Sequence, residues 1–278
     1  MNGIRLLLFT LFAAFACDAA SLRIMTFNVR YPAKGDGVNV WEARRDLLVE
    51  TVRAHHPDLM GTQELFQLQG DYIVSKLPDY AWFGRSRRGD HTDEHMGVFY
   101  RKDRLELVDS GDFWLSETPE TVGSMSWGVT LPRMVTWGDF KDKQTGQTFR
   151  YMNTHFAHRR EDEEARTNSA RVIVDRLKAL PEGRTVILTG DFNTGMDSEA
   201  HRQLATVLTD PWSAEAKGPA GTFHGFRGTP GRARIDWIMF RGALIPKSME
   251  TITDHQGEVY PSDHFPVLAV FETSAAKR

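Results

Sequence analysis

The sequence predicts an α+β sandwich in which β-sheets pack between layers of helices. Three observations support this fold class. Short apolar patterns typical of strands alternate along the chain with amphipathic helical patterns. The 278 residues contain no internal repeat, low-complexity stretch or long linker that would divide them. Polar residues recur at the ends of the apolar strands, so that they can converge on one edge of a sheet.

The first half of the chain is expected to hold two helices among its strands. The helix Trp41–His55 has apolar residues at Leu47, Leu48 and Val52, and Pro57 ends it. A second helix is expected near 66–76. Apolar runs predict strands at 22–29, 58–62, 80–84, 96–101 and 105–113.

The second half of the chain is expected to hold one long helix and one short one. The helix at 161–180 carries one apolar face, made of Ala170, Ile173, Val174 and Leu177. The short helix is expected near 198–207. Strands are predicted at 134–139, 149–155, 185–189, 233–240 and 267–271.

Residues 1–19 are predicted to be a secretory signal peptide, which leaves 20–278 as a single domain. Arg5 precedes a short apolar run at 6–16, and small residues follow it. The run is too short to span a bilayer comfortably, and a buried N-terminal helix is the alternative. We expect a secreted or periplasmic protein. A lipid anchor on Cys17 stays open, because a small residue precedes this cysteine.

The composition excludes some functional classes. The net charge of −3 is not that of a protein that coats long nucleic acid, although a local basic groove remains compatible with it. Cys17 is the single cysteine, so the mature chain needs no disulfide and offers no thiolate to a metal.

Several carboxylates lie beside apolar runs, where an unpaired charge is expensive. Glu64 follows the strand at 58–62, Asp191 follows the strand at 185–189, and Asp236 lies within an apolar run. Burying such charges costs several kcal/mol unless they are paired or bind a metal. A site of oxygen ligands without cysteine favours Mg²⁺, with Mn²⁺ as the alternative.

Each of these residues also has a structural explanation when taken alone. Asn28 could close a turn after its strand, and Asp191 could form an Asx-turn or cap a helix. His155 could be a half-buried histidine with satisfied hydrogen bonds. Asp236 could pair with Arg234 or Arg232. The shared position at strand ends favours a common site.

Six short motifs resemble the endonuclease/exonuclease/phosphatase superfamily, and they occur in that family's order over residues 22–272. In this sequence they read Thr26-Phe27-Asn28-Val29-Arg30, Gly61-Thr62-Gln63-Glu64, Asn153-Thr154-His155-Phe156, Gly190-Asp191-Phe192-Asn193, Arg234-Ile235-Asp236-Trp237 and Ser262-Asp263-His264-Phe265-Pro266. The resemblance is to a bacterial extracytoplasmic branch. It implies a four-layer α/β/β/α sandwich of the DNase I-like type, with the site at one edge of two packed sheets.

The resemblance also implies roles for individual residues. Glu64 matches the principal metal ligand, with Asn28 beside it and Asp263 near the metal. His264 matches the histidine that faces the scissile phosphate, oriented by Asp236. The remaining matches are Asp191 and Asn193, which position the attacking water and contact the phosphate, and His155, the second active-site histidine. Glu94 lies where some members carry a glutamate partner for that histidine, with Asp93 and His95 as competitors.

These residue types suit the hydrolysis of a phosphoester. A metal on Glu64 would supply Lewis-acid charge. The unit of Asp236 and His264 is typical of a carboxylate that fixes the tautomer and orientation of an imidazole. His155 and Asn193 would stabilise developing negative charge. The sequence leaves open whether Asp191 or His264 accepts the proton of the water.

Two segments and two separate arginines are candidates for contacting the substrate. The basic segment 84–91 is either a solvated charge run or an anion-binding loop. The glycine-rich segment 221–232 carries Phe223 and Arg227, and its aromatic residues could stack on a base or sugar or simply pack. Arg133 and Arg166 are further candidates for a phosphate clamp, with surface ion pairs as the alternative.

The sequence therefore predicts a secreted, metal-dependent hydrolase of phosphodiester bonds, with a nuclease as one form of it. An enzyme acting on phospholipids or sugar phosphates is the enzymatic alternative, because the net charge disfavours long polyanions. A non-enzymatic binding module on the same fold is the alternative of another class. The expected partner is a phosphoester substrate, with nucleic acid included. We expect a monomer without a stable protein partner.

Overall fold

The computed structural model describes residues 20–213 and 215–273. The predicted signal peptide and Cys17 lie outside the described residues. Within these residues, no helix combines the length and apolar character needed to cross a membrane.

The strands form two mixed sheets that face each other. The first sheet has the order β10-β11-β1-β2-β4-β3, and its strands span Leu244–Thr251, Val267–Thr273, Ala20–Asn28, Leu59–Gln63, Val98–Arg101 and Tyr80–Phe83. The second sheet has the order β5-β6-β7-β8-β9, and its strands span Leu105–Trp114, Met134–Asp142, Thr148–His155, Val186–Asp191 and Asp236–Arg241.

Each sheet contains one parallel pair, and a helix connects the two strands of that pair. In the first sheet β1 and β2 run parallel, joined through α1 (Trp41–His55). In the second sheet β7 and β8 run parallel, joined through α3 (Glu163–Lys178). A parallel connection needs such a crossover, and the helix then covers the outer face of its sheet. The carboxyl ends of both parallel pairs therefore emerge on one side of each sheet.

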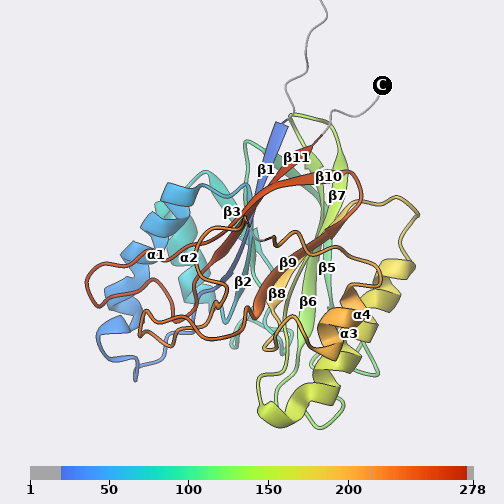
Figure 1. Ribbon diagram of the computed structural model, residues 1–278. Helices are drawn as coiled ribbons and strands as arrows, with labels where there is room; N and C mark the ends of the chain where they lie inside the picture. Colours follow the sequence, from blue (N-terminus) through green and yellow to red (C-terminus); the bar gives the residue numbers. More distant parts are fainter. Residues whose placement is uncertain (1–19, 214, 274–278) are drawn as a thin grey trace, which may run out of the picture.

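The helices cover the outer faces, so the sandwich has four layers (Figure 1). The helices α1 and α2 (Gln67–Lys76) pack on the first sheet, and α3 and α4 (Glu199–Leu204) pack on the second. Two short 3₁₀ turns, Gly37–Asn39 and Arg160–Asp162, precede α1 and α3. This arrangement confirms the predicted four-layer α/β/β/α sandwich.

The core consists of three layers of apolar side chains. Between the sheets, Leu22 and Ile24 of β1 meet Tyr151 and Ile187 of the second sheet. The next side chains of β1, Met25 and Phe27, face the opposite way and pack against α1 and α2. Successive side chains of a strand alternate between its faces, which explains why β1 is apolar on both.

The chain ends of the described sandwich lie opposite the site edge. Ala20 at the start of β1 pairs with Thr273 at the end of β11. The carboxyl end of β1 carries Asn28, and it points to the other end of the sandwich. The motif residues at the strand ends therefore lie at the end of the sandwich opposite Ala20 and Thr273.

One strand was missed and several expected boundaries differ from the structure. Strand β10 was not predicted, because Pro246 and Lys247 interrupt its pattern; it is an edge strand with a bulge between Pro246 and Ser248, where proline is tolerated. Helix α4 is shorter than the expected 198–207. Strand β9 begins at Asp236 and not at residue 233, so Asp236 stands at a strand end.

Candidate active site at one edge of the two sheets

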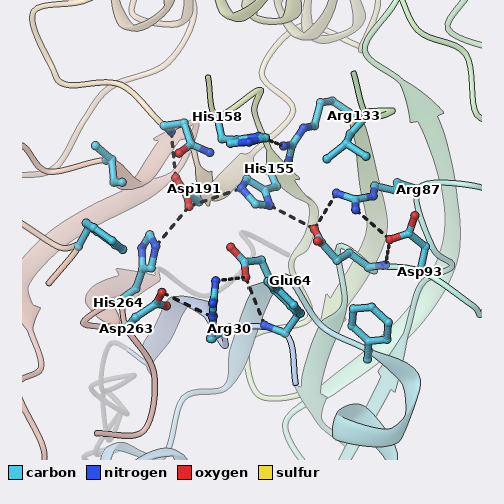
Figure 2. Close-up of a pocket in the computed structure, with 17 residues that line it drawn as sticks. Arg30, Glu64, Arg87, Asp93, Arg133, His155, His158, Asp191, Asp263 and His264 are labelled. Carbon is cyan, nitrogen blue, oxygen red and sulfur yellow. Dashed lines mark hydrogen bonds and ion pairs between the residues drawn. The ribbon is translucent and has the colours of Figure 1, made fainter. Parts of the chain in front are cut away.

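A cavity of about 650 Å³ opens at the edge where the two sheets present their functional residues. Figure 2 shows His264 and Asp263 on one side of it, Asp191, His155 and Glu64 in the middle, and Arg87 and Arg133 on the other side. Nine residues singled out from the sequence line this cavity: Glu64, Glu94, Arg133, His155, Asp191, Asn193, Phe223, Asp263 and His264. Asn28 and Asp236 lie directly behind them, fully buried.

His264 and Asp236 form a buried hydrogen-bonded pair. The Nδ1 atom of His264 lies 2.9 Å from Oδ2 of Asp236, and its Nε2 atom lies 3.7 Å from Oδ2 of Asp191. Burial alone would lower the pKa of His264, but the charges of Asp236 and Asp191 outweigh it and raise the pKa to about 10. His264 is therefore an imidazolium at neutral pH, with a proton on the nitrogen that faces the cavity.

Asp191 lies at the centre of the site, at the carboxyl end of β8. Its Oδ2 atom accepts a hydrogen bond from the amide of Asn28 at 3.0 Å and lies 3.6 Å from Nε2 of His155. Its Oδ1 atom accepts the backbone N–H of Asn193 at 2.9 Å, which is an Asx-turn. Burial, followed by the negative charge of Asp236, raises the pKa of Asp191 to about 7.

Asn28 joins the carboxylates of the two sheets. Its Nδ2 group donates to Glu64 Oε1 at 3.1 Å and to Asp191 Oδ2 at 3.0 Å, while its Oδ1 atom accepts the backbone N–H of Arg30. In this arrangement Asn28 acts as a hydrogen-bonding link, and its expected role as a metal ligand stays a prediction. The amide oxygen is committed to closing a turn, and the face toward the site is a hydrogen-bond donor, which a cation cannot use.

Three non-glycine residues of the cavity wall have left-handed backbone conformations. Arg30, Glu64 and Asn193 have φ angles of 55°, 57° and 51°. Such conformations cost on the order of 1–3 kcal/mol each and persist only where the surroundings enforce them. Each of the three follows the end of a strand by no more than two residues. The turn at each position aims a side chain into the cavity instead of continuing the sheet.

His155 connects the centre of the site to Glu94. Its Nδ1 atom lies 3.9 Å from Oε2 of Glu94, whereas Asp93 binds Arg87 and His95 binds the carbonyl of Leu65. Of the three acidic or basic candidates at 93–95, Glu94 is thus the one beside His155. Burial and the charge of Arg133 hold the pKa of His155 well below its usual range, so this imidazole is neutral.

Two buried arginines line the side of the cavity farthest from His264. The guanidinium of Arg87 pairs with Glu94 and Asp93 at 2.8 and 2.9 Å. Arg133 donates to Nδ1 of His158 at 3.0 Å and has no ion-pair partner among the described residues. We refer to Arg87, Arg133 and His158 as the arginine end, and to Asp191, Asp236 and His264 as the catalytic end.

Several cavity residues were not assigned to the site from the sequence. Arg30 contacts Glu64 and Asp263 at 3.8 Å, and its position two residues after Asn28 was the available signal. His158 follows His155 by three residues. The other unassigned lining residues are Tyr31, Phe66, Leu131 and Ile235, whereas Arg87 belongs to the basic segment 84–91 and Asp93 was a competitor of Glu94.

Two substrate-binding candidates lie outside this cavity. The guanidinium of Arg166 is buried and donates to the carbonyls of Ala157 and Arg159 and to Glu163. It fastens the start of α3 and is not available to clamp a phosphate. Arg227 is exposed and does not line the cavity.

The basic segment 84–91 is also largely neutralised by ion pairs. Arg85 pairs with Asp112 at 2.8 Å, and Arg88 pairs with Asp93 at 2.7 Å. With Arg87 bound to Glu94, each arginine of the segment has a carboxylate partner. The segment therefore offers little free positive charge to a long polyanion.

The residues present fit a hard divalent cation. Three carboxylates from different elements, those of Glu64, Asp191 and Asp263, line the same cavity, and oxygen donors of this kind suit Mg²⁺ or Mn²⁺. The ligand atoms of Asp191, Asp236 and His264 also lie within 4.8 Å of one another. Among the described residues Glu64 and Asp263 belong to no such compact group, so their assignment as metal ligands rests on the match to the family motifs.

The two-sheet sandwich and its edge site, with a carboxylate–histidine pair beside a carboxylate cluster and arginines, define a class of phosphate-directed hydrolases. The profile of the Endonuclease/Exonuclease/phosphatase family matches residues 25–264. The chain belongs to this family, whose members are hydrolases that act on phosphoester bonds. The family resemblance expected from the six motifs is thereby confirmed.

Similar solved structures come from bacteria. An endonuclease/exonuclease/phosphatase from Bacteroides vulgatus is 37% identical, covering 92% of this chain and 100% of its own, with a TM-score of 0.86. A mannosyl-6-phosphatase from Bacteroides thetaiotaomicron is 32% identical, covering 90% and 99%, with a TM-score of 0.84.

Curated relatives are more distant and longer. Tyrosyl-DNA phosphodiesterase 2 from Danio rerio is 24% identical over 86% of this chain and 64% of its own length. The chain spans 51% of nocturnin from Xenopus laevis, to which it is 25% identical.

Proposed function

We propose that this chain is a divalent-metal-dependent phosphoesterase that hydrolyses small phosphate esters outside the cytoplasm. The observation that carries the proposal is the catalytic end itself. Asp191 lies at ion-pair distance from two imidazoles, one cationic and one neutral, at the mouth of a cavity that also presents Glu64 and Asp263.

The charge state of the catalytic end supports a division of labour between acid and base. A cationic His264 cannot accept a proton, but its Nε2–H can donate to a phosphoryl oxygen and stabilise developing charge. Asp191 has a pKa near neutrality and lines the cavity, where it could accept the proton of an attacking water. Asp191 is therefore assigned as the general base and His264 as the electrophilic clamp.

The neighbouring residues orient this pair and the phosphate. Asp236 fixes the orientation of the His264 ring through its 2.9 Å contact and stabilises its charge. Asn193 lines the cavity with its amide, one hydrogen of which is held by the carbonyl of Phe156 at 3.1 Å. Neutral His155 supplies a further hydrogen-bonding group without adding charge.

Glu64, with Asp263, would hold the metal ion, which leaves Asp191 free to act as the base. When bound, a divalent cation there supplies Lewis-acid charge and neutralises part of this acidic wall toward an anionic substrate. Asn28 holds the carboxylates of Glu64 and Asp191 close together, because its amide nitrogen donates a hydrogen bond to each of them.

Two observations support a small substrate. The cavity volume of about 650 Å³ falls within the usual range for small-molecule sites. The similar Bacteroides thetaiotaomicron structure is a mannosyl-6-phosphatase. A sugar phosphate is thus the leading substrate class, and Tyr31, Phe66 and Phe223 on the cavity wall offer apolar faces to a sugar ring.

Phosphodiester cleavage in nucleic acid is the second candidate function. It is favoured by the likeness to tyrosyl-DNA phosphodiesterase 2, for which a structure with a single-strand DNA product has a TM-score of 0.73 at 21% identity. The paired arginines of the segment 84–91 count against it.

A substrate panel tests the proposal. Purified residues 20–278 would be assayed with Mg²⁺ or Mn²⁺ on mannose 6-phosphate, p-nitrophenyl phosphate, bis-p-nitrophenyl phosphate, single-stranded DNA, RNA and sphingomyelin. We expect phosphate release from the sugar monoester. Turnover of nucleic acid without turnover of any monoester would replace this assignment with the nuclease.

The extracytoplasmic part of the proposal depends on residues 1–19. Expression of the full chain in a bacterial host, followed by fractionation and mass spectrometry of the N-terminus, checks it. We expect processing near residue 19 and export of the remaining chain as a monomer. An unprocessed protein in the cytoplasm would contradict it, and a lipid on Cys17 would identify a membrane-anchored form.

A further inference from the structure

Arg133 is a buried cation without a carboxylate partner. Its side chain is 4% exposed, it lines the cavity, and no carboxylate of the described residues lies within ion-pair distance of it. Within the described part of the chain its Nε and Nη1 groups have no hydrogen-bond partner, and Nη2 binds only the neutral acceptor Nδ1 of His158. A guanidinium in this condition is poorly compensated, because it has lost water without gaining an anion.

Arg87, the other arginine of this end, provides an internal contrast. It is buried to a similar degree, but Glu94 and Asp93 contact it at 2.8 and 2.9 Å. The same wall of the cavity thus contains one arginine that is paired within the protein and one that is not. The unpaired one is where an anion from outside would bind.

The order of strands separates Arg133 from the reacting groups. Along the second sheet, β9, β8 and β7 present Asp236, Asp191 and His155 at the same edge, in register with one another. Arg133 immediately precedes β6, the next strand. Adjacent strands lie about 4.8 Å apart, so the strand of Arg133 is about 10 Å from that of Asp191 and about 14 Å from that of Asp236.

The side chains keep this separation. Figure 2 shows Arg133 and Arg87 on the far side of His155 from His264. A phosphate held between His264, Asp191 and Glu64 therefore has His155 between itself and the arginine end. The free donors of Arg133 are left for a different part of the bound molecule.

We infer that the arginine end is a subsite for a second anionic group, so that the preferred substrate is a phosphate ester whose organic part carries another phosphate or a carboxylate. This inference rests on the proposed function, and it specifies the substrate class of that site. Arg133 supplies a planar set of donors that matches either group. Glu94 pairs with Arg87, so its negative charge offsets part of the positive charge of the subsite.

A matched series of three sugars tests the inference. Glucose 1-phosphate, glucuronic acid 1-phosphate and glucose 1,6-bisphosphate present a hydroxyl, a carboxylate and a phosphate at the same carbon. Wild-type residues 20–278 would be assayed with Mg²⁺ for release of the 1-phosphate from each, identified by the sugar product so that loss of the 6-phosphate from the bisphosphate is counted separately, and kcat/KM compared. We expect at least one of the two doubly anionic esters to exceed glucose 1-phosphate by about tenfold or more, as one charge-assisted hydrogen-bond pair implies.

The variant Arg133→Met identifies the residue responsible. We expect it to reduce the ratio of kcat/KM between the preferred doubly anionic ester and glucose 1-phosphate by about tenfold. Arg171→Met, which removes an exposed arginine of α3 that lies outside the cavity, should leave this ratio unchanged. If Arg133→Met fails to fold, the kcat/KM ratios of the wild type for the three esters still test whether a second anion is preferred.

The outcomes separate the inference from the proposed function. Equal kcat/KM values for all three esters in the wild type, or a parallel loss on all three in Arg133→Met, would overturn the second-anion subsite while leaving the phosphatase intact. Absence of phosphate release from every ester of the series and from mannose 6-phosphate would instead reject the proposed function. The better of the carboxylate and phosphate esters identifies the second group.

Discussion

The two ends of the cavity are built on the same sheet edge but balance charge in opposite ways. At the catalytic end one imidazolium, His264, is surrounded by the carboxylates Asp236 and Asp191. At the arginine end Arg87 takes the carboxylates of both Asp93 and Glu94, and Arg133 pairs with neither of them. At the catalytic end the positive charge of His264 is balanced by carboxylates of the protein itself. The arginine end is incomplete without a ligand.

This contrast teaches that burial of charge alone does not mark a catalytic residue. His264 and Arg133 are both almost completely buried and both line the cavity. Their hydrogen-bond partners distinguish them, because His264 is oriented by a fixed anion and Arg133 by a neutral histidine. His264 is therefore predicted to set the rate of the reaction, and Arg133 is predicted to set the preference among substrates.

Removal of the divalent metal should lower kcat/KM more than any single substitution at either end of the cavity. The carboxylates of Glu64, Asp191 and Asp263 would then face an anionic substrate without neutralisation. We expect excess EDTA to lower kcat/KM by on the order of 10³-fold or more, with recovery on adding Mg²⁺. Full activity in excess chelator would show that the acidic wall does not hold a metal.

His264→Ala should have the next largest effect. It removes the charged donor that faces the phosphate, and loss of one such donor costs on the order of 10²–10³ in kcat. Phosphate release from the best monoester would be measured beside His255→Ala, an exposed histidine remote from the cavity, as the matched control. Equal activities of the two variants would exclude His264 from the chemistry.

Asp236→Asn tests whether a fixed anion sets the protonation of His264. In the wild type, activity should rise with pH as Asp191 loses its proton near pH 7 and fall as His264 loses its own near pH 10. Without the charge of Asp236 the pKa of His264 falls, so the upper limb should move toward neutral pH, with about a tenfold loss at pH 9. An upper limb that stays in place would contradict the assigned pair.

Glu94→Gln should have the smallest effect, and it acts at the arginine end. Burial raises the pKa of Glu94 to about 7 despite the nearby Arg87, so near neutral pH this carboxylate is partly ionised. Its neutralisation leaves more positive charge for a bound anion, and we expect KM for a doubly anionic ester to fall about two- to fivefold with little change in kcat. The matched control is Glu182→Gln, an exposed site outside the cavity. An unchanged KM, or a fall in kcat that exceeds the change in KM, would remove Glu94 from the subsite.

Much of the catalytic end could be predicted from the sequence, because its residues lie at the ends of apolar strands or just before one. Asp191 and His155 end β8 and β7, and parallel neighbours place their carboxyl ends together. Asn28 was located in the same way, but the sequence could not tell which face of its amide points to the site. That choice depends on the backbone N–H of Arg30, which becomes available only in the folded turn.

The arginine end was harder to predict, for a physical reason. Arg87 and Arg166 look alike in sequence, as basic residues among other charges, and only packing decides that one lines the cavity and the other holds the start of α3. Arg133 was identified as a candidate clamp, but its lack of a carboxylate partner is a property of the assembled fold. Strand β10 was missed because Pro246 breaks the pattern at a bulge.

The central claim is that the two ends of one cavity have separable tasks. Its most direct test is the kcat/KM ratio between a doubly anionic ester and glucose 1-phosphate, measured in His264→Ala and Arg133→Met. We predict that His264→Ala lowers both values by the same factor and preserves the ratio, whereas Arg133→Met lowers the ratio about tenfold. A ratio that changes equally in the two variants, or in neither, would contradict the claim.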